Sequence, residues 1–384
     1  MSEKEKEQQA ETSGQILEQE KEEVVDDLDE AEEIIPFTYS ISSYGADYPV
    51  DSLVKRIEAK DILVPTFSWD PEDETQIIGF QRQYVWPRSK ADRFIESLLL
   101  GLPVPGIFLV KEPSGVLLVL DGHQRLFTLY SYYNGIISGT EYRLSKVQER
   151  FEGKRFKDLD AEDRRRLDDS IIHATVVRQD EPTEDQSSIY AIFERLNTGG
   201  VNLQPQEIRV ALYHGEFVRV LKELNDQQVW RSLYGHKSKR LKDMELILRF
   251  FAFLYYSSQY RKPMKDFLNR YMATNRDLKR QSEDKLREIF DLTTEVIGKY
   301  IGPKAFRPKR AVNAAVVDSV MTGVAKRLID KGAITDKDKD KLNQAFDGLM
   351  KNVKYAGAVE TGTADESNVK IRLEQAKKAF SQIP

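Results

Sequence analysis

The most informative stretch of this sequence is VLDGHQRL, residues 119–126. Its apolar start predicts the end of a buried strand, its glycine predicts a tight turn, and a helix is expected from about His123 to Tyr133. Backbone N–H groups at a helix N-terminus bind anions, and glycine lets a phosphate approach the backbone. Arg125 adds a permanently charged fork for phosphate oxygens, and Asp121 offers a ligand for a divalent cation or a group that orients water. An equally good interpretation makes Asp121 the helix N-cap and Arg125 its structural ion-pair partner.

The segments around this turn predict an α+β domain over about 36–200, followed by an all-α domain over 201–384. In the first domain, helices are expected from about Asp51 and, with Ser89 as N-cap, from about residue 90. Strand-like runs cover 37–41, 106–110, 115–120 and 171–177, and a further helix covers 184–196. Beyond residue 204 the strand signals disappear, and helical spacing covers 204–213, 216–224, 243–256, 264–273, 282–300, 309–330 and 335–350.

The first 35 residues form an acidic tail. Residues 1–33 hold 14 acidic and 3 basic side chains, a local net charge of −11 against −5 for the whole chain, so the other 351 residues carry about +6. The tail has a few scattered apolar residues and no aromatic residue, so burial cannot offset its ordering entropy. We interpret it as a disordered, solubilising tail. The alternative is a phosphate mimic that covers a basic groove until substrate displaces it.

Composition excludes several classes of protein. The chain contains no cysteine, which removes disulfides, thiolate nucleophiles and cysteine-based zinc sites. No apolar run approaches the roughly 18 residues that a membrane span needs, and the N-terminus lacks the pattern of a secretory signal. We therefore expect a cytoplasmic protein without membrane contact.

Two further blocks carry candidate ligand-binding residues. Gln81, Arg82, Tyr84, Trp86 and Arg88 combine cations, an amide and aromatic rings, which suits phosphate binding with base stacking. The alternative is that the two aromatic residues belong to the core and Arg82 packs across them.

The third block follows the helix that ends near Arg195. Asn197 and the Gly199–Gly200 pair form a turn there, which serves either ligand contact or a helix C-cap. Glu207 and Arg209 lie two apart on the next helix and so face different directions, which indicates that they stabilise a joint between domains.

Residues 103–108 followed by 119–126 resemble the ParB/sulfiredoxin-like superfamily, in which a proline-containing strand leads to a D/G-G-x-x-R turn. The blocks FQRQYVW (80–86), DGHQR (121–125), and IFERLNTGGVNL (192–203) with QEIR (206–209) resemble a narrower family more closely. That family forms the N-terminal module of modification-dependent (type IV, GmrSD-like) restriction endonucleases and related phage-defence proteins. The resemblance covers roughly 76–210, and residues 245–250 also fit the family's helical extension.

The resemblance implies a small mixed sheet with flanking helices, and binding and hydrolysis of a nucleoside triphosphate (NTP) with Mg²⁺, coupled to DNA recognition. His123 stands where close relatives usually have glutamine. The implied catalytic residues are Asp121, Gln124 and Arg125, with Asp121 also holding the metal, and the implied nucleotide contacts are Gly122, His123, Gln81, Arg82, Tyr84 and Asn197.

The expected partners are DNA and a nuclease subunit in trans, with self-association left open. The four histidines show no paired metal-ligand spacing, so a self-contained His-Asn-His nuclease is not expected, and the chain lacks a Walker phosphate loop. In the helical half, cations gather around 231–242 and 307–310, where they contact nucleic-acid phosphates or simply form solvated helix ends. The leading hypothesis is a DNA-sensing NTPase of a restriction or phage-defence system. The alternatives are a non-catalytic nucleotide-gated DNA clamp or adaptor and a weak ParB-like nuclease.

Overall fold

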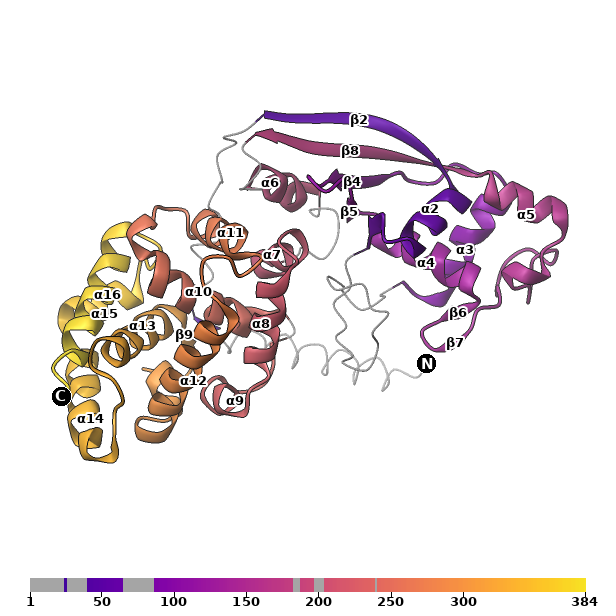
Figure 1. The fold of residues 1–384 in the computed structure, drawn as a ribbon. Helices are drawn as coiled ribbons and strands as arrows, with labels where there is room; N and C mark the ends of the chain where they lie inside the picture. Colours follow the sequence, from indigo (N-terminus) through magenta and orange to yellow (C-terminus); the bar gives the residue numbers. More distant parts are fainter. Residues whose placement is uncertain (1–23, 26–39, 65–85, 182–186, 197–203, 239) are drawn as a thin grey trace. The chain divides into compact units, whose positions relative to one another are not determined.

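The computed structural model of the chain describes residues 24–25, 40–64, 86–181, 187–196, 204–238 and 240–384. It divides into two compact units, one spanning 37–214 and the other combining 1–36 with 215–384 (Figure 1). The first unit contains a five-stranded sheet with flanking helices, and the second is helical apart from short extended segments. The expected fold class, a small mixed sheet with helices followed by a helical region, is therefore confirmed.

The sheet of the first unit is mixed. β2 and β8 are antiparallel over their length and run side by side in Figure 1, β8 and β4 are parallel, β4 and β5 are antiparallel, and β5 and β3 are parallel. In sheet order the strands are β2 (Ser40–Pro49), β8 (Ile171–Glu181), β4 (Ile107–Lys111), β5 (Leu117–Asp121) and β3 (Ile62–Leu63).

Helices cover both faces of this sheet. Leu109 and Val119 belong to a core shared with three helices on one face, whereas Leu118 and Leu120 are buried on the other face because side chains alternate along a strand. Strands covered on both sides read as nearly continuous apolar runs, which is how β4 and β5 appear in the sequence. The first three helices are α2 (Val50–Glu58), α3 (Arg88–Leu99) and α4 (His123–Asn134), and α6 (Ser187–Leu196) contacts β5 and β8.

Smaller elements complete the first unit. A hairpin of two-residue strands follows α4 and leads through a 3-10 turn to a helix with a capped N-terminus. The N-cap of that helix is Asp160, whose carboxylate accepts the N–H of Asp163 at 2.9 Å. These elements are β6 (Ile136–Ile137), β7 (Thr140–Glu141), η1 (Phe156–Asp158) and α5 (Ala161–Asp168), and α7 (Pro205–Leu212) lies at the end of the unit.

Two boundary predictions in this unit need comment. The predicted N-cap Ser89 is wrong: α3 begins at Arg88, and Pro87 precedes it as N-cap, its carbonyl accepting the N–H of Lys90 at 2.8 Å. The strand predicted over 37–41 is observed from Ser40, because residues 37–39 lie outside the described part of the chain.

The second unit is built around two long buried helices. α10 (Lys242–Tyr256) is buried from Asp243 to Leu254, and α13 (Ala314–Lys331) contacts α10, α12 and α16. The remaining helices are α8 (Glu216–Asn225), α9 (Gln228–Tyr234), α11 (Met264–Asn275), α12 (Glu283–Tyr300), α14 (Lys339–Met350), α15 (Val353–Glu360) and α16 (Glu366–Phe380), with short 3-10 turns η3 (Ser257–Gln259), η4 (Pro303–Phe306) and η5 (Asp336–Asp338).

The helix predicted over 309–330 begins five residues later than expected. Val312–Asn313 form β9, which pairs in parallel with β1 (Val24–Val25). Asn313 then serves as the N-cap of α13, its side chain accepting the N–H of Val316 at 2.9 Å. Within the described residues, no helix is both long and apolar enough to cross a membrane.

Candidate functional site

The turn at the end of β5 requires glycine. Gly122 has a φ of 101°, in the left-handed region, and is the N-cap of α4. A Cβ at this position would lie 2.4 Å from Cγ2 of Ile107, so any side chain would displace the start of β4. Because Gly122 has no side chain, a ligand can approach the backbone of the turn directly.

The N-terminus of α4 is suited to an anion. Gly122 provides no capping side chain, and among the described residues no side chain caps this helix end, so none of them neutralises the partial positive charge there with a capping oxygen. Asp121 is therefore not the N-cap, which corrects the first half of the structural alternative considered from sequence. A phosphate or carboxylate group at this helix end would accept hydrogen bonds from the first-turn N–H groups.

The ion pair between Arg125 and Asp121, the second half of that structural alternative, is observed. Nη2 of Arg125 donates to Oδ2 of Asp121 at 2.8 Å and to the carbonyl of Gly106 at 2.9 Å. The side chain of Arg125 is 14% exposed and that of Asp121 is 47% exposed. Both contacts use one nitrogen, and Nε of Arg125 has no hydrogen-bond partner among the described residues. The guanidinium is thus fixed in orientation at the turn, with the carboxylate beside it open to solvent.

His123 is neutral at physiological pH. Burial lowers its pKa from the ordinary value to about 4, against the opposing effect of the nearby Asp121 carboxylate. Its Nε2 is buried and has no hydrogen-bond partner in the described part of the chain. His123 therefore carries no positive charge for phosphate at neutral pH.

Gln124 links this turn to the first sequence block. Its Oε1 accepts the backbone N–H of Trp86 at 3.3 Å. The Trp86 ring packs against the core, lies edge-on to Phe94 with centroids 5.7 Å apart, and has Nζ of Lys90 4.7 Å from its centroid. Trp86 thus has the packing role that was considered as the alternative to base stacking, and the end of its block adjoins the turn.

Arg88, the last residue of that block, has structural contacts. Its Nε donates to Asp92 at 3.0 Å, its Nη2 donates to the carbonyl of Arg143 at 2.7 Å, and its guanidinium lies 4.1 Å from the ring centroid of Tyr142. Four predicted nucleotide contacts lie outside the described residues, namely Gln81, Arg82, Tyr84 and Asn197. The Gly199–Gly200 pair lies outside them as well.

Glu207 and Arg209 make structural contacts at α7, and their expected role at a joint between domains stays a prediction. Oε2 of Glu207 accepts the N–H of Gln204 at 2.6 Å, completing a capping box at the start of α7. Arg209 is fully buried, and its Nη1 donates to Oε1 of Gln206 at 3.2 Å. These contacts hold the end of the first unit together, and the carboxylate is committed to a backbone N–H.

Sequence reasoning missed the contribution of the segment before β4. Gly106 supplies the carbonyl that holds Arg125, and a Cβ on Gly106 would lie 2.6 Å from the carbonyl oxygen of His173 in β8. The signal for this role was the proline-glycine stretch 103–106, which was used only for the resemblance.

The described residues provide few ligands for a metal ion. No group of three or more histidine, aspartate or glutamate side chains with suitable placement occurs among them. Asp121 is the carboxylate at the turn, and it is paired with Arg125. Mg²⁺ binds through one or two carboxylates together with phosphate oxygens and water, so the site fits a metal that arrives with a phosphate chain.

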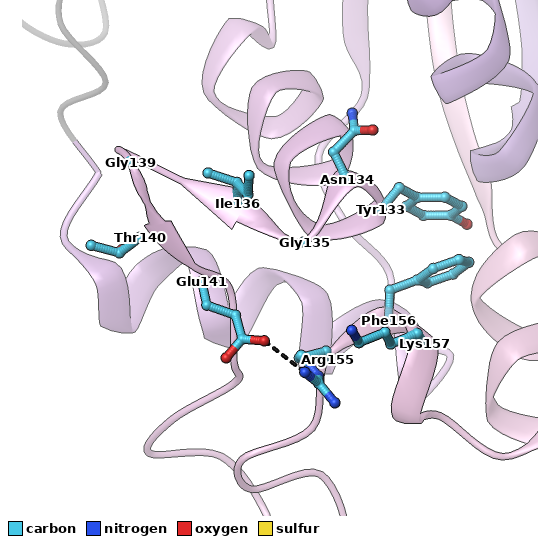
Figure 2. Close-up of a pocket in the computed structure, with 10 residues that line it drawn as sticks. All are labelled: Tyr133, Asn134, Gly135, Ile136, Gly139, Thr140, Glu141, Arg155, Phe156 and Lys157. Atoms are coloured by element: carbon cyan, nitrogen blue, oxygen red, sulfur yellow. Dashed lines mark hydrogen bonds and ion pairs between the residues drawn. The ribbon is translucent and has the colours of Figure 1, made fainter.

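A cavity of about 430 Å³ lies at the opposite end of α4 (Figure 2). Tyr133 and Phe156 stack there with centroids 4.0 Å apart, and Arg155 pairs with Glu141 at 2.6 Å. The 12 residues of α4 span about 18 Å, so this cavity is distant from the Asp121 turn. A helix C-terminus carries partial negative charge, and Arg155 is also paired with Asp158 at 2.6 Å. This cavity is therefore less suited to phosphate than the start of α4.

In the helical unit, two cations of the first cluster are neutralised. Arg231 donates to the buried Asp243 at 2.8 Å, and Lys237 pairs with Asp226 at 2.5 Å. The second cluster, near η4 and β9, lies beside a cavity of about 440 Å³. The sequence count of cations therefore overstates the charge available at the first cluster.

A mixed α/β unit with a glycine turn at the start of α4, joined in one chain to a helical unit, defines the class of this protein. Residues 50–214 match the family model for the N-terminal domain of the GmrSD restriction endonucleases. The match spans less than half of the chain and lies within the first unit. It supports the expected relation to restriction-system proteins.

A search of curated protein sequences gives no match to the chain. The broader resemblance to the ParB/sulfiredoxin-like superfamily stays a prediction.

Proposed function

We propose that the chain is a DNA-sensing, NTP-hydrolysing component of a restriction or phage-defence system that acts with a nuclease partner. The family match over 50–214 supports the restriction context. The observation that favours a nucleotide is the start of α4, where Gly122 leaves the helix end uncapped and Arg125 is fixed beside it. An uncapped helix N-terminus next to a guanidinium is a favourable environment for phosphate oxygens.

Each residue at the turn has a defined task in this proposal. The first-turn N–H groups of α4 bind phosphate oxygens, and Arg125 binds the same group while the Gly106 carbonyl fixes its orientation. Asp121, half exposed, orients a water molecule or contributes a metal ligand once a phosphate competes for Arg125. A bound magnesium nucleotide would supply the phosphate chain and a cation that withdraws charge from it. Gln124 positions the turn through the Trp86 N–H.

The testing experiment measures phosphate release from ATP, GTP, CTP and UTP with magnesium, each with and without duplex DNA. Loss of a hydrogen bond to a charged group is expected to weaken nucleotide binding by about tenfold to a hundredfold in Arg125→Ala. Arg125→Lys keeps the charge but loses the fork, so we expect an intermediate effect. Arg166→Ala, which removes an exposed arginine from α5, is the matched charge control and is expected to bind as the wild type does.

Three outcomes separate the candidate functions. Turnover that DNA stimulates and that Arg125→Ala abolishes supports the proposal. Nucleotide binding without turnover favours the non-catalytic clamp or adaptor. Wild-type binding and turnover in Arg125→Ala would contradict the assignment of this turn as the nucleotide site.

A further inference from the structure

The surface around β9 in the helical unit is basic on one side and apolar on the other. Its rim carries Lys304, Arg307 and Lys309, and Arg310 is exposed in the adjoining segment. Glu360 pairs with Lys309 at 3.1 Å, and Arg307 donates to the carbonyls of Leu233 and Tyr234. The adjoining cavity of about 440 Å³ has an inner wall that includes Phe346, Met350 and Val359. We call this surface the β9 groove. A groove of this kind suits an acidic segment with interspersed apolar residues.

The chain itself contains such a segment. Residues 16–33 include Ile16, Leu17, Val24, Val25 and Leu28 among most of the acidic side chains of the tail. Val24 and Val25 form β1, which pairs in parallel with Val312 and Asn313 of β9. The pairing brings two residues from the middle of the acidic segment to the edge of the β9 groove.

We propose that the β9 groove is the docking site of the chain's own acidic segment, residues 16–33, and that the docked segment keeps anionic polymers off the basic rim. In the sequence, Glu22 and Glu23 directly precede β1, and Arg310 and Ala311 directly precede β9. The acidic sequence around β1 and the basic rim carry opposite charges, which attract each other.

In the sequence, Asp26 and Asp27 directly follow β1, and α13 directly follows β9. That helix has 18 residues, and its N-terminus carries partial positive charge, which favours neighbouring carboxylates. The basic rim, the pairing of β1 with β9 and the N-terminus of α13 therefore all favour the acidic segment as the occupant of the groove. The tail is more than a solubilising extension in this inference.

The inhibition of DNA binding by the docked segment rests on the proposed function, whereas the docking itself does not. The absence of cysteine allows the two to be tested separately, because an introduced cysteine pair is the only pair present. Val24 and Val312 are direct partners in the register, and neighbouring strands bring Cα atoms within the range that a disulfide spans. We would compare Val24→Cys/Val312→Cys with Val24→Cys/Val353→Cys, whose second site is 85% exposed on α15 of the same unit.

Under mild oxidation, we expect the 24–312 disulfide to form within one chain, roughly tenfold faster than the 24–353 disulfide, because docking raises the local concentration of the pair. Free-thiol titration and non-reducing electrophoresis measure this. Equal rates for the two pairs, or no 24–312 disulfide, would overturn the docking.

The second measurement is the affinity for a 20-base-pair duplex by fluorescence anisotropy. We expect the oxidised 24–312 protein to bind at least about threefold more weakly than its reduced form at low salt, with the difference vanishing near 0.5 M salt. A chain without introduced cysteines in which Glu22, Glu23, Asp26 and Asp27 are changed to their amides should bind the duplex more tightly than the wild-type chain.

Equal affinities of the oxidised and reduced forms would overturn the screening while the disulfide result still decides the docking. If no form binds DNA, the DNA part of the proposed function fails together with the screening, and the docking again stands or falls on the disulfide rates.

Discussion

At Gly122 the backbone has a φ of 101°, and the space for a Cβ is already filled by Ile107. Gly115 provides a matched control because its φ is 90° but no atom lies within 4 Å of its Cβ position. We expect Gly115→Ala to lose about 1 kcal/mol of unfolding free energy from backbone strain alone. Gly122→Ala should lose a further 1–3 kcal/mol or so from the clash, and should also weaken nucleotide binding. Denaturant unfolding followed by circular dichroism checks this, and equal losses would contradict the close approach to Ile107.

His123 gives the protein a specific acid sensitivity. Its folded pKa of about 4 lies below the unfolded value of about 6.5, so the unfolded state binds the proton first as the pH falls. The stability contributed by neutral His123 is therefore complete above pH 6.5 and is lost as the pH falls toward 4, by no more than about 3 kcal/mol. We expect His123→Gln to reduce the stability difference between pH 7.5 and pH 4.5.

The control for this prediction is His236→Gln, which removes an exposed histidine of the helical unit. If His123→Gln and His236→Gln change the stability difference alike, the burial of His123 does not govern the response to pH.

The turn could be predicted from sequence because its information is local: a strand, a glycine and a helix start follow one another within eight residues. The partners of its side chains could not. Arg125 contacts the carbonyl of Gly106, 19 residues earlier, and Gln124 contacts the N–H of Trp86, 38 residues earlier. Periodicity describes one segment at a time and does not show which segments meet.

At the scale of elements, apolar runs identified β4 and β5 because both faces of these strands are buried, and β8 because Ile172, Ala174, Val176 and Val177 are buried. β2 was predicted only at its start, since its sequence SISSYGADYP is largely polar and it lies at the edge of the sheet. The start of α13 was placed too early because residues 309–313 are compatible with helical spacing, whereas the Asn313 cap and the β9 pairing fix the later start. Local propensity gave way to tertiary contacts in both places.

The capping box of α7 gives a prediction at this scale. Glu207→Ala removes the carboxylate that accepts the Gln204 N–H, and we expect a loss of about 1 kcal/mol of unfolding free energy. Glu207→Gln retains an acceptor and should lose less. If Glu207 instead takes part in the chemistry, Glu207→Gln would abolish NTP turnover while leaving stability intact, which would contradict the capping role.

At the scale of the whole chain, the distribution of charge matters more than its total. The net charge of −5 combines an acidic tail with a basic remainder of the chain. Within that remainder, ion pairs such as Arg231–Asp243 and Lys237–Asp226 neutralise cations that form a patch in the sequence. A charged interface therefore depends on which cations are left after folding. The β9 groove and the start of α4 are places where the described residues set positive charge next to a concave or uncapped surface.

The helical unit is held together by a buried ionic cluster that ties three helices. Asp318 on α13 accepts from Nη2 of Arg249 on α10 at 2.8 Å and from Nη2 of Arg372 on α16 at 2.9 Å. All three side chains are at most 3% exposed. Removing the carboxylate would leave two buried guanidinium groups without their shared counter-ion, and breaking a buried pair in this way typically costs 3–5 kcal/mol or so.

We therefore expect Asp318→Asn to lower the denaturant midpoint of the helical unit strongly, as followed by the fluorescence of the fully buried Trp230. Asp336→Asn is the matched control, because its partner Lys299 lies 2.7 Å away and both side chains are more than half exposed. An exposed pair contributes only about 0–1 kcal/mol, so this variant should unfold near the wild-type midpoint. A midpoint for Asp318→Asn equal to that of Asp336→Asn would show that apolar packing around α10 and α13 holds the unit without the ionic cluster.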